Sequence, residues 1–141
     1  MDMGFDAILP LAVALLVVGG LLYVVGFFLG KKPKALNKAV YREKWQAIQA
    51  LADKGGDALP MAVLRADSLL DQALRDKGIP GKTMGERMKH AQKRWSNANS
   101  VWAAHKLRNR IAHETTVQLA PQMVQSALAS FYRGLQDLGA V

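Results

Sequence analysis

Histidine, asparagine and arginine side chains gather in one short segment near the end of the sequence, residues 100–114. His105, Asn109 and His113 follow one another at intervals of four, so a helix places them in one polar row. Arg108 falls on the edge of the apolar stripe of the same helix. An imidazole exchanges protons near neutral pH, and a guanidinium binds anionic oxygens through a planar fork. The segment therefore holds the residue types for acid–base work on an anionic substrate.

Arg108 also has a structural interpretation. Asp67 lies on the apolar side of a helix expected earlier in the chain, beside Leu70, and Asp71 follows one turn later. A buried charge is costly unless it is paired, so two opposite charges on apolar faces suggest each other. The sequence therefore predicts an Arg108–Asp67 ion pair inside the protein, which leaves the other two polar residues of the segment unexplained.

Arg108, Asn109 and His113 together form the pattern RNxxxH. This pattern is similar to the signature of the HEPN superfamily (higher eukaryotes and prokaryotes nucleotide-binding domains), and the likeness in architecture covers residues 35–139. The resemblance implies a small all-helical bundle of four or five helices, with the motif at the end of a late helix. It also implies a homodimer in which two motifs face one groove.

Many HEPN proteins are metal-independent endoribonucleases in which the 2′-hydroxyl of RNA attacks the adjacent phosphate. By this resemblance His113 is the general base or acid, Arg108 binds or neutralises the phosphate, and Asn109 orients the phosphate or the histidine. If Asp67 fully occupies Arg108, the arginine instead holds the helix so that His113 points into the groove. Neighbouring side chains are the expected substrate contacts: Arg110, Lys106 and His105. A single histidine one turn before the motif, such as His105, is more often structural or solvent-facing.

The resemblance leaves two other classes of function open. The first is a non-catalytic HEPN-like module for dimerisation or scaffolding at the inner membrane. In that case His113 ends a helix, where its charge favours the helix dipole, and Arg108 stays in its ion pair. The second is a basic adaptor that lies on a membrane surface and binds another protein.

Glycine and proline residues divide the chain after residue 34 into helical segments. Apolar residues recur between them at spacings of three and four, and no run alternates as a half-buried strand does. We therefore expect an all-α fold, a four- to five-helix bundle without a sheet. The expected helices cover residues 35–54, 58–77, 83–95, 100–114 and 121–138.

Polar residues at the expected helix ends have the types that cap helices. Asp57, Thr83 with Glu86, and Asn97 or Asn99 are expected at N-termini, and Gly78 at a C-terminus. The apolar stripes predict the core: Val40, Trp45, Ile48, Leu51, Val63, Ala66, Leu70, Ala73, Leu74, Val101, Ala104, Leu107, Ile111, Met123, Ala127, Leu128, Phe131, Leu135 and Leu138.

The start of the chain is of a different kind. Ala7 to Gly30 is a run of 24 residues without a charge, long enough for a helix to cross the ~30 Å hydrocarbon core of a bilayer. A cleaved signal peptide, the alternative, has positive charge before a shorter apolar run, whereas here acidic residues precede the run. We expect an anchor over residues 1–30 that spans the bilayer at about 7–30, a basic linker over 31–34 and a bundle over 35–141.

Lysines follow the apolar run directly, at Lys31, Lys32 and Lys34. Positive residues favour the cytoplasmic side, so the sequence predicts a single-pass protein of the inner (cytoplasmic) membrane with its N-terminus outside and its bundle in the cytoplasm. Gly26 and Gly30 form one GxxxG pattern, which can seat a helix dimer.

The charge of the chain is concentrated after the anchor. All 19 basic residues lie within residues 31–141 against nine acids, so this part carries a net charge of +10. A basic surface attracts phosphates, which favours RNA as a partner. An anionic inner leaflet accounts for the same charge next to the membrane.

The sequence also excludes several chemistries. It contains no cysteine, so a disulfide framework, a thiol nucleophile and a cysteine-zinc site are all excluded. His105 and His113 have Glu114 as their only nearby ligating carboxylate. We therefore expect no metal site and no cofactor.

Overall fold

The computed structural model describes residues 5–29 and 34–141, and the chain divides into two compact units between Pro33 and Lys34. The first unit contains helix α1 (Phe5–Leu29). The second contains the bundle. Most of the predicted basic linker, and Gly30 of the predicted GxxxG pattern, lie outside the described residues.

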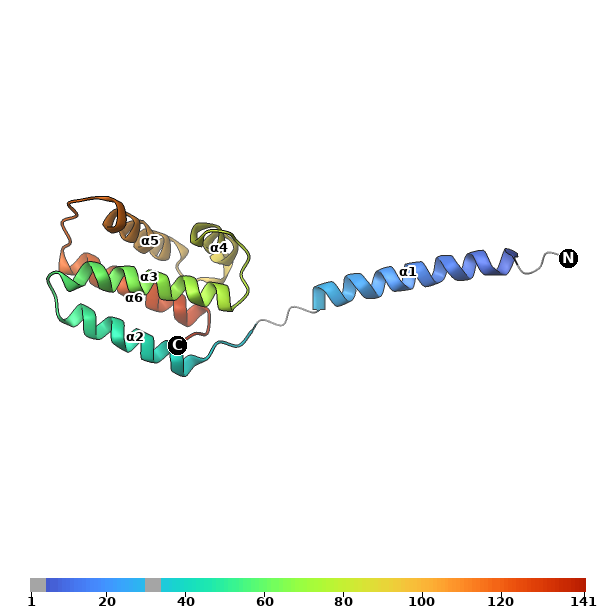
Figure 1. The fold of residues 1–141 in the computed structure, drawn as a ribbon, viewed down its shortest axis with the longest axis horizontal. Coiled ribbons are helices and arrows are strands. Elements are labelled where there is room, and N and C mark those ends of the chain that lie inside the picture. The colour runs from blue at the N-terminus through green and yellow to red at the C-terminus, as the bar shows by residue number, and fades with distance from the viewer. Residues whose placement is uncertain (1–4, 30–33) are drawn as a thin grey trace. The chain divides into compact units, whose positions relative to one another are not determined.

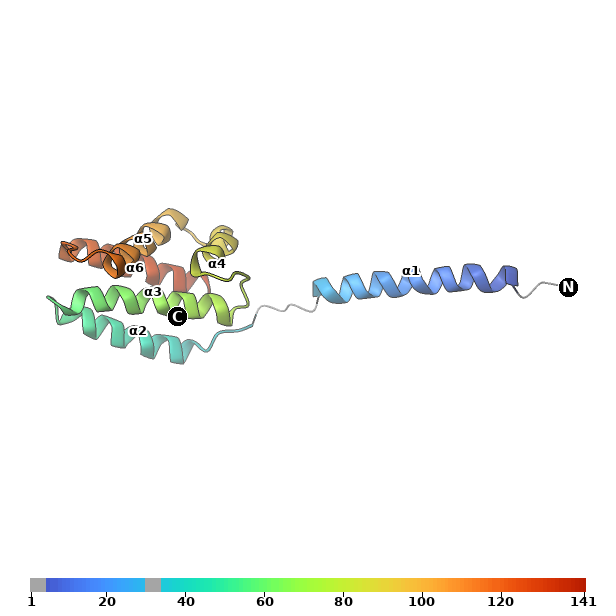
Figure 2. The ribbon, with the colours of Figure 1, turned by 45° about the horizontal axis from the view of Figure 1, so that its top comes forward.

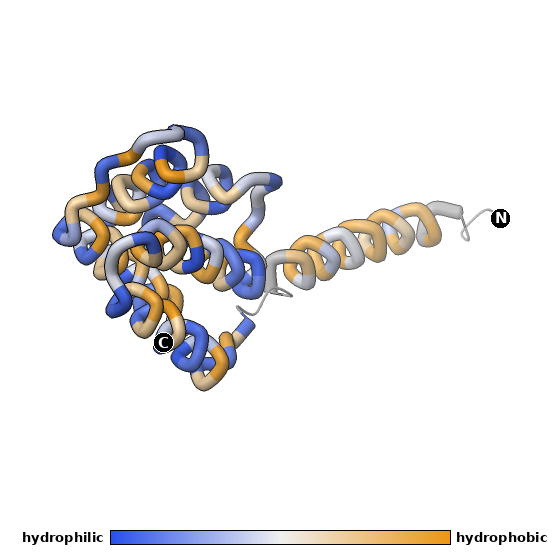
Figure 3. Tube along the Cα trace, turned by 60° about the vertical axis from the view of Figure 1, so that its left-hand side comes forward, coloured by the Kyte–Doolittle hydropathy of each residue, from blue (hydrophilic) through white to orange (hydrophobic). Residues whose placement is uncertain are grey.

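Helix α1 has no charged residue after Asp6, and its colouring by hydropathy is mostly hydrophobic (Figure 3). It has 25 residues, which at ~1.5 Å per residue exceeds the ~30 Å hydrocarbon core of a bilayer. None of the side chains of Ile8–Phe27 is buried within the structure. The protein therefore has one N-terminal helix that is long and apolar enough to span a membrane.

The second unit is all-helical in its described residues, 34–141, as the sequence predicts. Its elements are α2 (Lys38–Asp53), α3 (Ala58–Asp76), α4 (Met84–Ala91), a short 3₁₀ helix η1 (Gln92–Arg94), α5 (Ala98–His113) and α6 (Pro121–Asp137). The five expected α-helices are present. The third ends earlier than predicted, because its last turn tightens into η1.

Helix α3 is the central element of the bundle. It packs against α2, α4, α5 and α6, and α5 packs in turn against α6 (Figures 1 and 2). Leu70 and Leu74 of α3 and Phe131 of α6 are among the largest side chains without solvent exposure. The motif helix α5 is therefore held by two neighbours, α3 on one side and α6 on the other.

Two residues predicted for the core are exposed, Val40 and Met123. In α2 the buried stripe is Tyr41, Trp45 and Ile48, whose spacing of four and three sets them on one face. Val40 precedes that stripe by one residue, or about 100° around the helix. The sequence prediction was wrong there because it favoured the aliphatic Val40 over the amphipathic Tyr41.

Asn97 and Thr83 cap their helices as the sequence predicts, whereas Asp57 makes no capping hydrogen bond. Asn97 Oδ1 accepts a hydrogen bond from Ser100 N at 3.1 Å, and Thr83 Oγ1 accepts one from Glu86 N at 3.2 Å. Asp57 occupies the N-cap position of α3, but its side chain makes no capping hydrogen bond. Asn97 is thus the residue that fixes where the motif helix begins.

Candidate functional site

The apolar face of α5 determines how the motif is presented. Val101, Ala104 and Leu107 are buried, at the spacing of three that aligns residues on one face of a helix. Because these side chains lie inside the bundle, the polar residues between them lie either on the side of α5 that faces α3 or on the outer surface of α5.

Asp67 of α3 is the centre of the buried polar cluster. It is only 2% exposed, and its Oδ2 lies 3.1 Å from Arg108 Nε. The two residues form the ion pair that the sequence predicts. Arg108 Nε is itself buried and makes no hydrogen bond, so the contact is one of charge rather than of a well-directed N–H. The Arg108 side chain keeps 32% of its surface exposed.

His105 is the second partner of Asp67, with 2.7 Å between His105 Nδ1 and Asp67 Oδ1. Asn109 links both partners, because its Oδ1 accepts from Arg108 Nη1 at 3.0 Å and its Nδ2 lies 3.3 Å from His105 Nε2. Arginine can only donate, which fixes the Asn109 amide orientation. His105 Nε2 then accepts from the amide, and His105 Nδ1–H donates to Asp67.

This arrangement is a closed network of four side chains, Asp67, Arg108, Asn109 and His105. Both ring nitrogens of His105 have partners, and its side chain is only 12% exposed. Neither ring nitrogen of His105 is therefore free of a partner within the network, and the substrate contact that the sequence suggested stays a prediction. Arg108 and Asn109 are held in the same way, one turn before the end of the helix.

His113 differs from the other two motif residues. It is exposed at the last position of α5, and it makes no hydrogen bond or ion pair within the described residues. Glu114 N still donates to Arg110 O at 2.8 Å, as in a helix, but the backbone of Glu114 is extended, with φ −99° and ψ 132°, so the helix ends here. The motif thus combines two anchored side chains with one imidazole that is open to solvent.

Two further predicted substrate contacts, Lys106 and Arg110, lie on the outer surface of α5. Arg110 Nε lies 3.4 Å from Glu114 Oε1, and each of the two side chains is 50% exposed. Such an exposed pair contributes little stability, so Arg110 can exchange this partner for another anion. Lys106 has no ion pair within the described residues.

The structure contains a second, largely buried ion pair that the sequence analysis did not predict. Arg87 of α4 binds Asp71 through two hydrogen bonds, Nε to Oδ1 at 2.8 Å and Nη2 to Oδ2 at 3.0 Å, and its Nη1 donates to Gly81 O at 2.7 Å. A signal existed, because Arg87 lies between Met84 and Met88 on the apolar face of its helix. Asp67 and Asp71 therefore attach α5 and α4, respectively, to α3.

Between these two ion pairs lies a cavity of about 140 Å³. Ligand pockets have volumes of roughly 300–1,000 Å³, so this cavity is too small for a nucleotide. Within the described parts of the chain, no group of three or more His, Asp or Glu side chains is placed to hold a metal ion.

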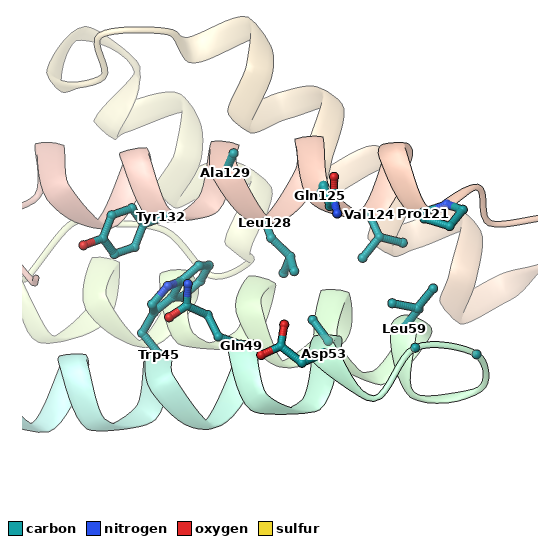
Figure 4. A pocket seen from close by; sticks show the side chains of 13 residues that line it. Trp45, Gln49, Asp53, Leu59, Pro121, Val124, Gln125, Leu128, Ala129 and Tyr132 are labelled. Atoms are coloured by element: carbon teal, nitrogen blue, oxygen red, sulfur yellow. The ribbon is translucent and has the colours of Figure 1, made fainter.

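A larger cleft of about 610 Å³ lies between α2 and α6 (Figure 4). Trp45 and Tyr132 pack against each other at one end of it, with ring centroids 5.1 Å apart. Asp53 is the one charged residue of its lining, and no motif residue contributes to it. Its size admits a ligand, but its lining offers little acid–base chemistry.

Comparisons with family models, with curated proteins and with solved structures return no match for this chain.

Proposed function

We propose that the protein is a membrane-anchored HEPN-like domain that cleaves RNA without a metal ion, at a composite site formed by two copies of the chain. The observation that carries this proposal is the geometry of α5. His113 is exposed at the end of a helix whose preceding turn is fixed by the buried Asp67 network. A catalytic imidazole needs a backbone in a fixed position, because acid–base catalysis requires the ring within hydrogen-bond reach of the proton that it transfers.

The cleavage reaction has a simple proton balance. A base takes the proton of the 2′-hydroxyl, the oxygen bonds to phosphorus, and the bond from phosphorus to the 5′-oxygen breaks as an acid protonates the leaving oxygen. His113 supplies one of these two proton transfers. Arg108 Nη2 makes no hydrogen bond within the described residues, and the side chain is one-third exposed, so it can still meet a phosphate oxygen.

His105 of the same copy is not free to make the second proton transfer, since both of its ring nitrogens are engaged. A two-fold axis near the end of α5 supplies a second His113, so one imidazole acts as base and the other as acid. Anchoring in a membrane raises the local concentration of the chains and favours such a dimer.

The position of the positive residues supports the proposed orientation in the membrane. Lysines follow the apolar helix at once, whereas residues 1–30 contain none. This asymmetry supports an orientation in the inner membrane with the N-terminus outside and the bundle in the cytoplasm. The cytoplasm is the compartment in which RNA is present.

One observation favours a second function, a non-catalytic scaffold that dimerises at the membrane. Arg108 faces Asp67 and donates to Asn109, so most of its guanidinium already has partners. In a scaffold the network only locks α5 onto α3, and His113 carries no chemistry.

The experiment compares the full chain in detergent micelles with two histidine variants, on a mixed RNA pool in the presence of EDTA. His113→Ala is expected to lower the cleavage rate at least a hundredfold, the scale typical of a lost acid–base group. His90→Ala, which removes an exposed histidine from α4, is the matched control and is expected to cleave normally.

Each other outcome counts against the proposal. A folded, dimeric parent that leaves RNA intact favours the scaffold. Equal cleavage by parent and His113→Ala removes His113 from the site.

A further inference from the structure

A groove of about 600 Å³ runs between α5 and α6, on the opposite side of α5 from the Asp67 network. Six of its eleven lining residues are alanine or serine. The lining residues are Ser100, Ala103, Ala104, Lys106, Leu107, Arg110, Gln122, Met123, Ser126, Ala127 and Ser130.

The charge of this groove has a single sign. Lys106 and Arg110 are the charged residues of its lining, and Glu114, the exposed partner of Arg110, lies outside the lining. The α2–α6 cleft of similar size has the opposite character, because Asp53 is its charged residue. The α5–α6 groove is therefore the one of these two that complements an anion.

Lys106 and Arg110 lie on the same side of α5 as the exposed His113. At 100° per residue, Lys106, Arg110 and His113 fall within about 60° of one another around α5. An anionic chain that follows Lys106 and Arg110 along the helix is thus led toward His113. Arg108 and His105 lie on the other side of the helix, where they face α3.

The hydroxyls in the groove suit a phosphate as well. Ser130 Oγ donates to Ser126 O, and Ser100 Oγ donates to Asn97 O. Ser126 Oγ makes no hydrogen bond within the described residues, so its proton is available for a phosphate oxygen. The lining has no aromatic side chain on which a base would stack.

From these observations we infer that the α5–α6 groove is the track that binds the backbone of a single RNA strand and delivers it to His113. The inference rests on the proposed function and names the binding surface for its substrate. Contacts of this kind read phosphates rather than bases, so binding depends strongly on salt and tolerates many sequences.

Cysteine protection tests the groove directly, because the native chain has no cysteine. Ser126→Cys puts a thiol in the α5–α6 groove, and Ala129→Cys puts one on the same helix in the α2–α6 cleft. Both positions are exposed. The full chain, carrying His113→Ala to prevent cleavage, is alkylated by a maleimide in micelles with and without a 12-nucleotide RNA of mixed sequence.

The RNA is expected to slow alkylation of the Ser126→Cys variant at least fivefold and to leave that of the Ala129→Cys variant unchanged. Equal protection of both thiols, or of neither, overturns the inference. Protection of the groove thiol that grows with protein concentration in the absence of RNA also overturns it, because the groove is then the interface with a second copy.

Charge removal gives the second readout. Lys106→Ser with Arg110→Ser is expected to weaken RNA binding about tenfold and to reduce the slope of log affinity against log salt by ~1.4, the value for two lost phosphate contacts on a single strand. Lys38→Ser with Arg42→Ser removes the same charges at the same spacing from the exposed side of α2, and is expected to leave the slope within about 0.4 of the parent value. Equal slopes for the two double variants contradict the inference.

These experiments distinguish a failure of the groove proposal from a failure of the ribonuclease proposal. Cleavage that depends on His113, without protection of the groove thiol, removes the groove and keeps the ribonuclease. Protection of the groove thiol with no cleavage by the parent chain keeps the groove as an RNA-binding surface and removes the enzyme.

Discussion

Tyr41 shows how one side chain couples the stability of the bundle to pH. Its hydroxyl donates to Asp76 Oδ2 at 2.7 Å. Burial first, and then the hydrogen bond and charge of Asp76, raise the pKa of Tyr41 above its usual value near 10. In the unfolded chain the phenol ionises near that usual value, whereas the folded protein retains the proton. The stabilisation is therefore fully present below pH ~10 and is lost as pH rises beyond it.

Tyr41→Phe is expected to lower the free energy of unfolding at pH 7 by about 1–2 kcal/mol, since it leaves Asp76 without its donor. Above pH ~10 the parent should lose stability faster than Tyr41→Phe, so the two curves converge. Thermal unfolding of the full chain in micelles, followed by circular dichroism, measures both effects. Tyr132→Phe is the control, since the Tyr132 hydroxyl makes no hydrogen bond within the described residues. A parent curve that stays parallel to that of Tyr41→Phe would contradict the assignment.

The motif residues show where sequence reasoning reaches its limit. The pairing of Arg108 with Asp67 was predictable, because both charges fall on apolar faces and a buried charge needs a partner. The bond between His105 and Asp67 was not predictable, because the rotation of α5 against α3 decides which neighbour of Arg108 shares the carboxylate. The exposure of His113 depends likewise on where the helix ends.

At the scale of the elements, Asp67 ties the motif helix to α3. Asp67→Asn keeps the shape of the side chain but removes the charge that offsets Arg108. We expect a loss of about 3 kcal/mol in the free energy of unfolding, at the lower end for a broken buried pair because Arg108 is partly exposed. Asp53→Asn, at an exposed position, is expected to change it by less than about 0.5 kcal/mol.

Denaturant titrations of the two variants in the same detergent measure this difference. Equal stability of the two would mean that the network is not what holds α5 in place. If Asp67→Asn also lowers RNA cleavage while His113 is intact, the network acts as a positioning device.

The helices themselves were largely predictable from the sequence. Spacing of apolar residues gave all five α-helices of the bundle, and glycine and proline gave their limits to within a few residues. The end of α4 was not predictable, because 3₁₀ turns are frequent at the ends of α-helices and no glycine or proline marks the start of η1. The pair between Arg87 and Asp71 was not predicted, although Arg87 lies on the apolar face of its helix.

At the scale of the whole molecule, the apolar α1 helix is the feature that can be tested independently of any activity. Val17→Arg with Val18→Arg places two charges at its middle, and each costs about 2.5–3.5 kcal/mol for insertion at the centre of a bilayer. The double variant is expected to leave the carbonate-resistant membrane fraction that the parent chain occupies. Gln46→Arg with Ala50→Arg adds the same charge to exposed positions of α2 and is expected to stay with the parent. Retention of the double valine variant would show that α1 does not insert.

The central place of α3 has a consequence for how the bundle opens. Because α3 packs against every other α-helix of the bundle, the detachment of a single neighbour leaves it covered by the remaining ones. Its amide hydrogens therefore exchange with solvent only when the whole bundle unfolds, whereas those of α4, attached chiefly through α3, also exchange through local opening. The slowest-exchanging amides of α3 thus report the global stability of the domain, and those of α4 report how firmly Arg87 holds Asp71.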